Sequence, residues 1–559
     1  MEKIVNLAKR RGFVFPSSEI YGGLAGFWDW GPLGVLLKNN IKREWWRTFV
    51  QKRSDMVGID GTIISAPKVW MASGHVDTFA DFLVDCQNCK HRFRGDHLIE
   101  QYTEQSIVDF AIAYLSDWIE SISERYGNAI VKKKISLEDL NIRVAESRKN
   151  LLESGIDPDE VLEESKKKKK LIIKSASDRQ EDLSLDAEFE AWKRVKSNIG
   201  EFINHYIYYS QIPCPSCKKT GEFTKARKFN LMLKTNIGPV EDSSSTGYLR
   251  PETAQSIFIN FENVRESTRK KLPFGIAQIG KAFRNEITPG NFVFRQREFE
   301  QMEIEYFVRP GDDDAHFSTW VEMCYQWFLS LGLKAEHLRK FEQPASELAH
   351  YSKATTDIEF TFPIEKGWGE LMGIANRTDY DLKQHGQHAK GSPEAFATPI
   401  DDEGKEKKVP FVIEPSMGVD RAALAFLLDA YTIIDGGRST TTESIKDEEV
   451  VLKLHPRLAP YTVAILPLSK KPELTAIAEP LLAELRKTWM VDYDQTGSIG
   501  KRYRRQDEIG TPLCVTVDFD TIEGVKRPKG TVTVRDRDTM EQHNVAIDEL
   551  PAYVAERLR

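Results

Sequence analysis

The stretch that decides the fold spans residues 276–307 and reads IAQIGKAFRNEITPGNFVFRQREFEQMEIEYF. Side chains alternate between the two faces of a strand, so residues two positions apart share a face. Ahead of the turn at residues 288–290, small and charged side chains share one face: Gln278, Gly280, Ala282, Arg284 and Glu286. Ile279 and Phe283 alternate with them and suit a core. The pattern predicts a strand with one chemical face and one structural face.

The second half of the stretch repeats this division after the turn. One face carries Arg297, Phe299, Gln301, Glu303 and Glu305, and the other carries Met302, Ile304, Tyr306 and Val308. We therefore expect a two-stranded antiparallel unit. Small residues beside charged ones let a ligand approach the backbone. Arginine suits an anionic ligand, because its rigid fork binds phosphate bidentately and stays charged.

A second arginine lies in Gly418-Val419-Asp420-Arg421 and begins an apolar segment. Apolar residues recur after it at helical spacing: Ala422, Leu424, Leu427, Leu428 and Tyr431. This spacing predicts a buried helix that starts at a strand-to-helix turn.

The two arginine motifs resemble motifs 2 and 3 of class II aminoacyl-tRNA synthetases. The resemblance implies that Arg284 and Arg421 are the catalytic residues, which hold the α-phosphate with the incoming carboxylate and the γ-phosphate, respectively. Glu286 would bind the adenine amino group and Phe299 would stack on the adenine. The class usually has Glu where this chain has Asp420. The implied ATP-binding residues are Arg284, Asn285, Glu286, Phe294, Arg295, Gln296, Arg297, Glu298, Phe299, Glu370, Leu371, Gly418, Val419, Asp420 and Arg421.

The same resemblance implies a fold and a metal ion. The expected fold is an α+β catalytic domain with a mostly antiparallel sheet flanked by helices, a helical insertion, and a C-terminal α/β anticodon-binding domain. Mg²⁺ is expected because clustered phosphates need a hard cation. A helix from Gly31-Pro32-Leu33, with Leu36, Leu37, Ile41, Trp45 and Phe49 at helical spacing, precedes a strand near residues 61–65 that ends at Pro67. Helix, strand and proline resemble motif 1, which forms the homodimer interface in this class.

Further motifs resemble the glycyl-tRNA synthetases and extend that resemblance over the chain apart from the insertion. They are Leu249-Arg250-Pro251-Glu252-Thr253-Ala254-Gln255, Phe299-Glu300-Gln301-Met302-Glu303 and Glu414-Pro415-Ser416-Met417-Gly418. The resemblance implies that Glu252, Glu303, Glu414 and Ser416 surround the glycine ammonium, with Arg94 and Arg377 nearby. The implied glycine-binding residues are Arg94, Glu252, Phe299, Glu300, Gln301, Met302, Glu303, Arg377, Glu414, Pro415, Ser416, Met417 and Gly418. Inward carboxylates can exclude a Cβ, and they need a cation in a dry site.

Composition sets the domain organisation. A chain of 559 residues with 40% hydrophobic and 29% charged residues is too long for one core. We expect a catalytic domain in two parts, residues 1–101 and 213–455, interrupted by a largely helical insertion at 102–212. Surface helices are expected at residues 141–152 and 187–195. The anticodon-binding domain is expected at 456–559, where strands and helices alternate in a largely parallel sheet.

Charge and hydropathy indicate where the chain could bind nucleic acid and in which compartment it is expected. The net charge of −7 argues against general attraction to nucleic acid but allows a local basic face. The lysine run at residues 166–170 is a solvated face or a tRNA contact. Lys501, Arg502 and Arg504 suit tRNA phosphates, Tyr503 suits packing or stacking, and a solvated basic helix is the alternative. No apolar run of membrane-spanning length and no secretory signal occur, so a cytoplasmic location is expected.

Four of the six cysteines form two CxxC pairs, Cys86 with Cys89 and Cys214 with Cys217. Four thiolates in two such turns suit a tetrahedral structural Zn²⁺, and turns without metal are the alternative. Cys324 and Cys514 lie in apolar settings typical of a core.

The expected activity is ligation of glycine to its tRNA through glycyl-adenylate. Two alternatives stay open at this point: a catalytically inactive synthetase-like binding module, and a related class II enzyme for threonine, proline or histidine.

Overall fold

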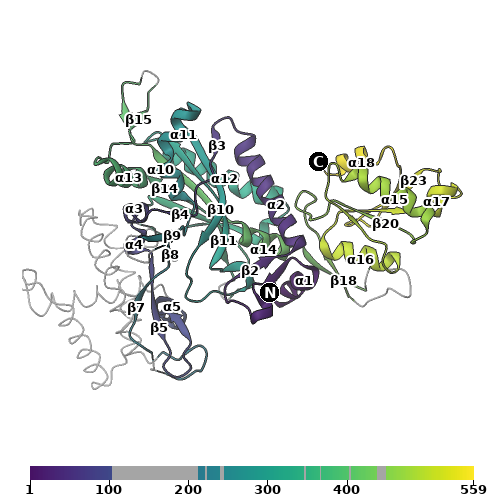
Figure 1. The fold of residues 1–559 in the computed structure, drawn as a ribbon, viewed down its shortest axis with the longest axis horizontal. Helices are drawn as coiled ribbons and strands as arrows, with labels where there is room; N and C mark the ends of the chain where they lie inside the picture. The colour runs from purple at the N-terminus through teal and green to yellow at the C-terminus, as the bar shows by residue number, and fades with distance from the viewer. Residues whose placement is uncertain are drawn as a thin grey trace, which may run out of the picture. The chain divides into compact units, whose positions relative to one another are not determined.

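The computed structural model of this chain describes residues 1–103, 212–220, 223–239, 245–344, 348–349, 351–364, 367–401, 404–436, 438 and 448–558. The chain forms two compact units, residues 1–79 with 231–559, and residues 80–230 (Figure 1). The helices expected at 141–152 and 187–195, the lysines at 166–170 and nearly all of the expected insertion lie outside the described residues.

A seven-stranded sheet forms the centre of the first unit, with the order β12-β13-β14-β17-β11-β10-β3. Neighbouring strands are antiparallel except β10 and β3, which are parallel. The mostly antiparallel sheet expected from the sequence is confirmed. The strands are β3 (Met56–Gly58), β10 (Phe274–Phe283), β11 (Glu298–Val308), β12 (Leu338–Glu342), β13 (Ala354–Phe360), β14 (Gly369–Thr378) and β17 (Phe411–Gly418).

One face of this sheet is covered by helices around the main hydrophobic core (Figure 1). The core-facing residues predicted for β11 lie there, with Met302 and Ile304 both fully buried. The covering helices include α1 (Glu2–Arg11), α2 (Pro32–Trp46), α12 (Asp313–Ser330) and α14 (Val419–Ala430). The helix predicted from Gly31-Pro32-Leu33 is thus confirmed.

The other face is divided between chemistry and packing. At one end Phe274, Ile276 and Phe307 pack into a second core with α10 (Ala254–Ile259), α11 (Phe261–Thr268) and α13 (Tyr380–Lys390). At the other end lie the polar residues of β10, β11 and β17. In the register, Gln278 pairs with Glu303 and Ala282 with Phe299. The shared chemical face predicted from the sequence is confirmed over this half only.

The connection between β10 and β11 is longer than a tight turn. Arg284, Glu286 and Arg297 were expected within strands, but β10 ends at Phe283 and β11 begins at Glu298. The ladder stops because backbone N–H groups bond elsewhere: Asn285 donates to the carbonyl of Leu231, and Arg297 donates to that of Gly26. The arginines therefore lie in a loop, which contains the 3₁₀ turn η5 (Phe292–Phe294).

Smaller elements frame the sheet. The strand expected at residues 61–65 is reduced to β4 (Ile64–Ser65), and Pro67 begins a helix instead of following a longer strand. The remaining elements of this part are β1 (Val14–Pro16), η1 (Glu19–Tyr21), β2 (Trp28–Trp30), η2 (Arg47–Gln51), α3 (Pro67–Ala72), α4 (His75–Thr78), β8 (Lys234–Asn236), β9 (Thr246–Leu249), η6 (Ala335–His337), β15 (Thr398–Pro399), β16 (Lys407–Lys408), β18 (Tyr431–Asp435) and β19 (Glu448–Leu452).

The C-terminal segment forms a five-stranded sheet with helices on both faces (Figure 1). Val463 and Ile465 face α15 and α18, while Ala464 and Leu466 face α16, as period two requires. The sheet is mixed: three strands are parallel, and two antiparallel strands follow. The elements are β20 (Val463–Pro467), α15 (Pro472–Leu485), β21 (Val491–Tyr493), α16 (Ile499–Ile509), β22 (Leu513–Val517), α17 (Phe519–Glu523), β23 (Thr531–Asp536), β24 (Gln542–Ala546) and α18 (Leu550–Arg557).

The second unit contains β5 (Ala80–Asp85), β6 (Arg92–Arg94), α5 (Gly95–Thr103) and β7 (Arg227–Asn230) among its described residues. The three strands form an antiparallel sheet, in which β5 is central. In the described part of the chain, no helix has the length and apolar composition needed to cross a membrane.

Candidate active site

Arg284 and Phe299 lie side by side where the β10–β11 pair ends. Nε of Arg284 donates to the carbonyl oxygen of Pro251 at 3.0 Å. The guanidinium carbon lies 5.4 Å from the centroid of the Phe299 ring. A fixed guanidinium next to an aromatic ring can bind a phosphate and a flat base together.

Arg421 lies in the first turn of α14, 4.4 Å from the ring centroid of Phe294. Its Nη1 donates to the carbonyl oxygen of Glu370 at 2.7 Å and lies 3.3 Å from Oε2 of the same residue. Asp357 borders the same space, because its Oδ1 and Oε1 of Glu370 both lie beside Gly373. A Cβ built on that glycine would be 3.4 Å from the Asp357 oxygen and 3.6 Å from the Glu370 oxygen. Burial, reinforced by Glu370, raises the pKa of Asp357 to about 7.

Asp420 is buried and points away from Arg421. It accepts hydrogen bonds from Nε1 of Trp30 at 2.6 Å, Nζ of Lys38 at 2.7 Å and the backbone N–H of Glu300 at 2.8 Å. Burial opposes its ionisation, but Lys38 holds the pKa of Asp420 below the usual value. Asp420 thus fixes the start of α14 against β2, α2 and β11, which orients Arg421.

The other expected ATP residues divide between loop and core. Arg297 donates to the carbonyls of Glu286 and Ala25, so its side chain braces the loop. Gln296 donates to the carbonyl of Val293 at 3.2 Å, and Glu298 pairs with Lys281 at 3.0 Å. Asn285 is held in the loop by its backbone N–H. Glu286 and Arg295 form a long ion pair at 3.9 Å. The side chains of Leu371 and Val419 are buried in the core.

Three glutamates predicted to bind an ammonium converge on the chemical face. Ser416 donates to Oε1 of Glu303 at 2.6 Å, from the directly paired position on β17. Nη1 of Arg377 donates to both oxygens of Glu414, at 2.9 and 3.0 Å. Glu252 lies 3.3 Å from Nε2 of His75. Two neighbouring strands and the segment before α10 therefore position these side chains.

The electrostatics of this pocket show a surplus of buried negative charge. Burial, and then Glu252, raise the pKa of Glu303. Burial likewise raises the pKa of Glu414 to about 8, although Arg377 opposes the shift. For Glu252, burial is outweighed by His75, so its pKa lies below the usual range. A ligand that brings an ammonium would stabilise such a site.

Four residues of the predicted glycine set lie on the other side of the sheet, because side chains alternate. Glu300 pairs with Lys38 at 3.2 Å and Lys42 at 2.8 Å. The side chains of Met302 and Met417 belong to the main core, and Pro415 alternates with Glu414 and Ser416 on the same strand. The side chains at these positions therefore point away from the chemical face, and their expected role in glycine binding stays a prediction. Gln301 and Gly418 pair across the strands, and Nε2 of Gln301 lies 3.4 Å from Oγ of Ser416.

The pocket also contains residues that sequence reasoning missed. Asp381 accepts from Nε and Nη2 of Arg377 at 2.8 and 2.9 Å, and the Tyr351 ring centroid lies 3.8 Å from the Arg377 guanidinium. Thr253 donates to Glu303. Asp381 and Tyr351 belong to no recognised motif and gave no signal, whereas Thr253 lies in the 249–255 motif but was not assigned a role. Glu305 had a signal, because period two placed it on the chemical face.

Arg94 lies in the unit of residues 80–230, where it pairs with Asp81 at 3.2 Å and also with Asp96. Its expected role in glycine binding stays a prediction.

The two CxxC turns of that unit meet in space. Sγ of Cys86 lies 3.7 Å from Sγ of Cys217, and Sγ of Cys89 lies 3.6 Å from Sγ of Cys214. All four sulfur atoms lie within 4.8 Å of one another, and none forms a disulfide. Zn–S bonds of about 2.3 Å in a tetrahedron give S···S separations of about 3.8 Å. The thiol cluster fits a zinc ion. Cys324 and Cys514 are buried in the core, as predicted.

The basic helix predicted to contact tRNA is turned partly inward. Arg502 is 1% exposed and donates to the backbone carbonyls of Pro467, Asp494 and Leu468, so it does not reach a phosphate. Tyr503 bonds to Thr516 and packs in a core. Lys501 is exposed.

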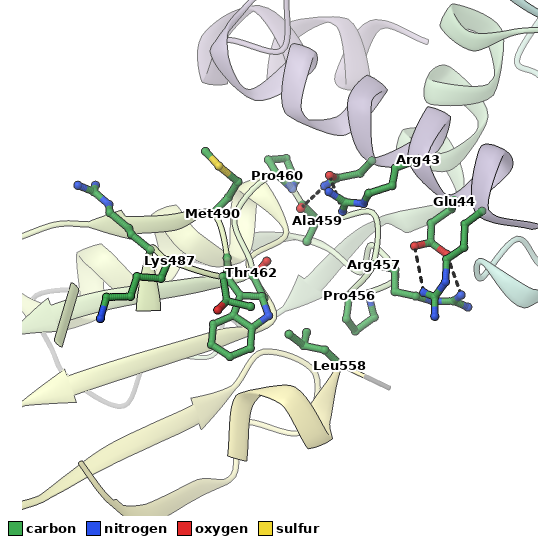
Figure 2. A pocket seen from close by; sticks show the side chains of 15 residues that line it. Arg43, Glu44, Pro456, Arg457, Ala459, Pro460, Thr462, Lys487, Met490 and Leu558 are labelled. Carbon is green, nitrogen blue, oxygen red and sulfur yellow. Dashed lines mark hydrogen bonds and ion pairs between the residues drawn. The ribbon is translucent and has the colours of Figure 1, made fainter. Parts of the chain in front are cut away.

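A different basic surface lines a cavity of about 550 Å³ beside α2 and the segments at 456–462 and 486–490 (Figure 2). Its lining includes one acid, Glu44, which pairs with Arg457 at 2.9 Å. Trp489 supplies an aromatic wall. Five cations border it: Arg43, Arg47, Arg457, Arg486 and Lys487.

Comparison with known proteins finds two family models that match the chain, both within the unit formed by residues 1–79 and 231–559. A family model of the "tRNA synthetase class II core domain (G, H, P, S and T)" matches residues 239–431, and one of the "Anticodon binding domain" matches 462–557. The chain is 47% identical over 560 residues to a glycine–tRNA ligase of Caldanaerobacter subterraneus subsp. tengcongensis, covering 100% of this chain and 98% of the relative. It is 45% identical over 559 residues to that of Thermobifida fusca, with 100% and 98% covered. It is 47% identical over 558 residues to that of Geobacillus thermodenitrificans, with 100% and 97% covered.

Proposed function

This chain belongs to the glycine–tRNA ligase family of class II aminoacyl-tRNA synthetases, and on that premise we propose which residues carry out its reaction. The enzyme activates glycine with ATP to glycyl-adenylate and pyrophosphate. It then transfers glycine to the 3′-terminal adenosine of tRNA. The observation that carries the residue assignment is the convergence of Glu252, Glu303 and Glu414 beside the Arg284–Phe299 pair.

The pocket binds glycine by its ammonium. The three N–H donors of the ammonium meet the carboxylates of Glu252 and Glu303 and the hydroxyl oxygen of Ser416. That hydroxyl donates its own hydrogen to Glu303. Arg377 fixes Glu414 from behind. Carboxylates fill the space that a larger side chain needs, so selection rests on exclusion as well as on the weak discrimination of one methylene, about 1–3 kcal/mol.

Activation needs positioned charge more than a protein nucleophile. The carboxylate of glycine attacks the α-phosphorus, a P–O bond forms, and the bond to pyrophosphate breaks. Arg284 stabilises the charge that builds on the α-phosphate oxygens while Phe299 stacks on adenine. Arg421, oriented by Asp420, neutralises the leaving pyrophosphate.

We propose that Glu370 and Asp357 would hold Mg²⁺ on the phosphates. Their oxygens border the same space beside Arg421, and hard oxygen ligands are what this ion requires. When bound, the ion would neutralise phosphate charge.

We propose that Cys86, Cys89, Cys214 and Cys217 hold a structural Zn²⁺, on the strength of their sulfur separations. After each CxxC pair the next residue, Lys90 or Lys218, has φ of 62°. The two turns also share the same backbone bonds, from Lys90 N–H to the Cys86 carbonyl and from Lys218 N–H to the Cys214 carbonyl.

We propose that the tRNA backbone contacts the cavity of Figure 2. Its lining carries five cations and one acid in a chain whose net charge is −7, and it includes residues of the anticodon-binding domain. Polyanionic RNA favours such a surface.

We also propose a homodimer, which the motif 1 resemblance of α2 supports. A cytoplasmic location fits the proposed role.

Pyrophosphate exchange into ATP, measured with each of the twenty amino acids separately, tests the assignment. Glycine alone should support exchange. Exchange with threonine, proline or histidine but not glycine would contradict it, and no exchange by folded protein with Mg²⁺ would favour a binding module.

A further inference from the structure

Glu305 is a buried acid in the glycine pocket for which the mechanism gives no role. It is 0% exposed, on β11 two residues after Glu303. Glu303 pairs with Ser416 and Tyr306 with Ile413, so the register sets Glu305 opposite Glu414. Oxygen atoms of Glu303, Glu305 and Glu414 lie within 4.8 Å of one another.

Among the described residues, Glu305 differs from the other pocket acids in its hydrogen bonds. Both of its oxygens are buried without a donor. By contrast, Glu303 accepts from Thr253 and Ser416, and Glu414 accepts from Arg377. Glu252 and Asp381 each accept from Gln255.

An ionised Glu305 would be unstable in this setting. A buried carboxylate without donors is strongly destabilised, and any negative charge on Glu303 or Glu414 adds repulsion. A protonated carboxyl avoids that charge and gains an O–H donor toward an oxygen of Glu303 or Glu414. Burial, and then Glu414, raise the pKa of Glu305 well above its usual range, in agreement with this geometry.

The charged groups facing Glu305 come from four elements. Glu303 lies on the same strand, Glu414 is on β17, Arg377 is on β14, and Asp381 is on α13. Arg377 is the cation in this set, and Asp381 and Glu414 already engage its guanidinium. The ammonium of a bound substrate can supply another positive charge.

We propose that Glu305 stores a proton in the empty glycine pocket and releases it to solvent when the glycine ammonium binds. The ammonium brings one positive charge and three donors to the neighbouring acids, which makes ionised Glu305 tolerable. Glu305 changes from carboxylic acid to carboxylate, and the buffer takes up the proton. Glycine affinity should therefore rise with pH through the neutral range, because binding releases a proton. This inference rests on the proposed placement of glycine.

Isothermal titration of glycine into the full-length protein tests it. The titration is repeated at one neutral pH in buffers of different ionisation enthalpy, and the slope of observed enthalpy against ionisation enthalpy counts the protons released. We expect the wild type to release about one proton more per glycine than Glu305→Gln, which keeps the shape of the side chain. Glu342→Gln, an exposed strand residue of the same sheet, should match the wild type.

Several results would overturn the proposal: no proton release by the wild type, the same release by Glu305→Gln, or a heat that follows the concentration of Na⁺ or K⁺ instead of the buffer. Failure of glycine to bind would count against the proposed function instead.

Infrared difference spectra give a check that needs no variant. Adding glycine to the wild type should remove the C=O stretch of a protonated carboxylic acid, and an unchanged band would refute the release.

Discussion

Replacing Arg377 by Met removes the cation that holds the glycine pocket together. Its guanidinium donates four charge-assisted hydrogen bonds of 2.8–3.0 Å to Asp381 and Glu414, and the side chain is 2% exposed. Breaking a buried pair by removing one partner costs about 3–5 kcal/mol, because the remaining charges stay buried without compensation. We therefore expect the free energy of unfolding to fall by about 3–5 kcal/mol. We also expect kcat/KM for glycine to fall, because Glu414 loses the side chain that fixes it.

A matched control separates this effect from loss of an ordinary ion pair. Arg339 also pairs with a glutamate, Glu359, and stacks on an aromatic ring, Trp368, but it is 44% exposed. Arg339→Met should cost about 0–1 kcal/mol and leave glycine activation near wild type. The assays are thermal unfolding by circular dichroism and glycine-dependent pyrophosphate exchange.

The pH dependence of Arg377→Met gives a further check. Arg377 lowers the pKa of Glu414, so in the folded variant that pKa should rise further above its unfolded value. Stability from such groups is present at low pH and is lost as the pH rises through the folded pKa values. The variant should therefore lose more stability than the wild type on going from acid to alkaline conditions. Equal losses for the two Met variants, or wild-type glycine kcat/KM in Arg377→Met, would refute the reasoning.

Three other outcomes follow from the geometry. Arg284→Ala should abolish glycine-dependent pyrophosphate exchange with unchanged circular dichroism and sedimentation, and near-normal exchange would exclude its role at the α-phosphate. Purified wild type should contain one zinc ion per chain and Cys214→Ser much less; equal metal content in both would dismiss the thiol site. Charge reversal of Arg43 and Arg486 together should raise the KM for tRNA, while pyrophosphate exchange stays intact. The slope of log affinity for tRNA against log salt concentration should become shallower by about 0.7–0.9 per lost phosphate contact. An unchanged KM for tRNA would remove the cavity of Figure 2 from the tRNA path.

Local periodicity predicted the part of the chemical face that lies within β10 and β11. Alternation placed Phe299, Glu303 and Glu305 together, and the β10–β11 register agrees. Alternation also assigns Glu300 and Met302 to the opposite face, although a motif taken as a block includes them. A motif identifies a segment of backbone, whereas the period of the strand decides which of its side chains reach the ligand.

Long-range partners could not be predicted from one sequence. One sequence does not show that the fold brings the carbonyl of Ala25, 272 positions away, to the guanidinium of Arg297. Arg502 belongs to a basic run, but it lies on the inward side of α16. The two CxxC pairs are separated by more than a hundred residues, and only a closed fold could show whether they meet.

The most direct measurement of the central claim is a crystal structure of this protein with a non-hydrolysable analogue of glycyl-adenylate. We predict that the ammonium lies among Glu252, Glu303 and Ser416, that adenine stacks on Phe299, and that Arg284 contacts the group in place of the α-phosphate. An ammonium bound away from these carboxylates, with Glu303 and Glu414 facing only protein atoms, would contradict it.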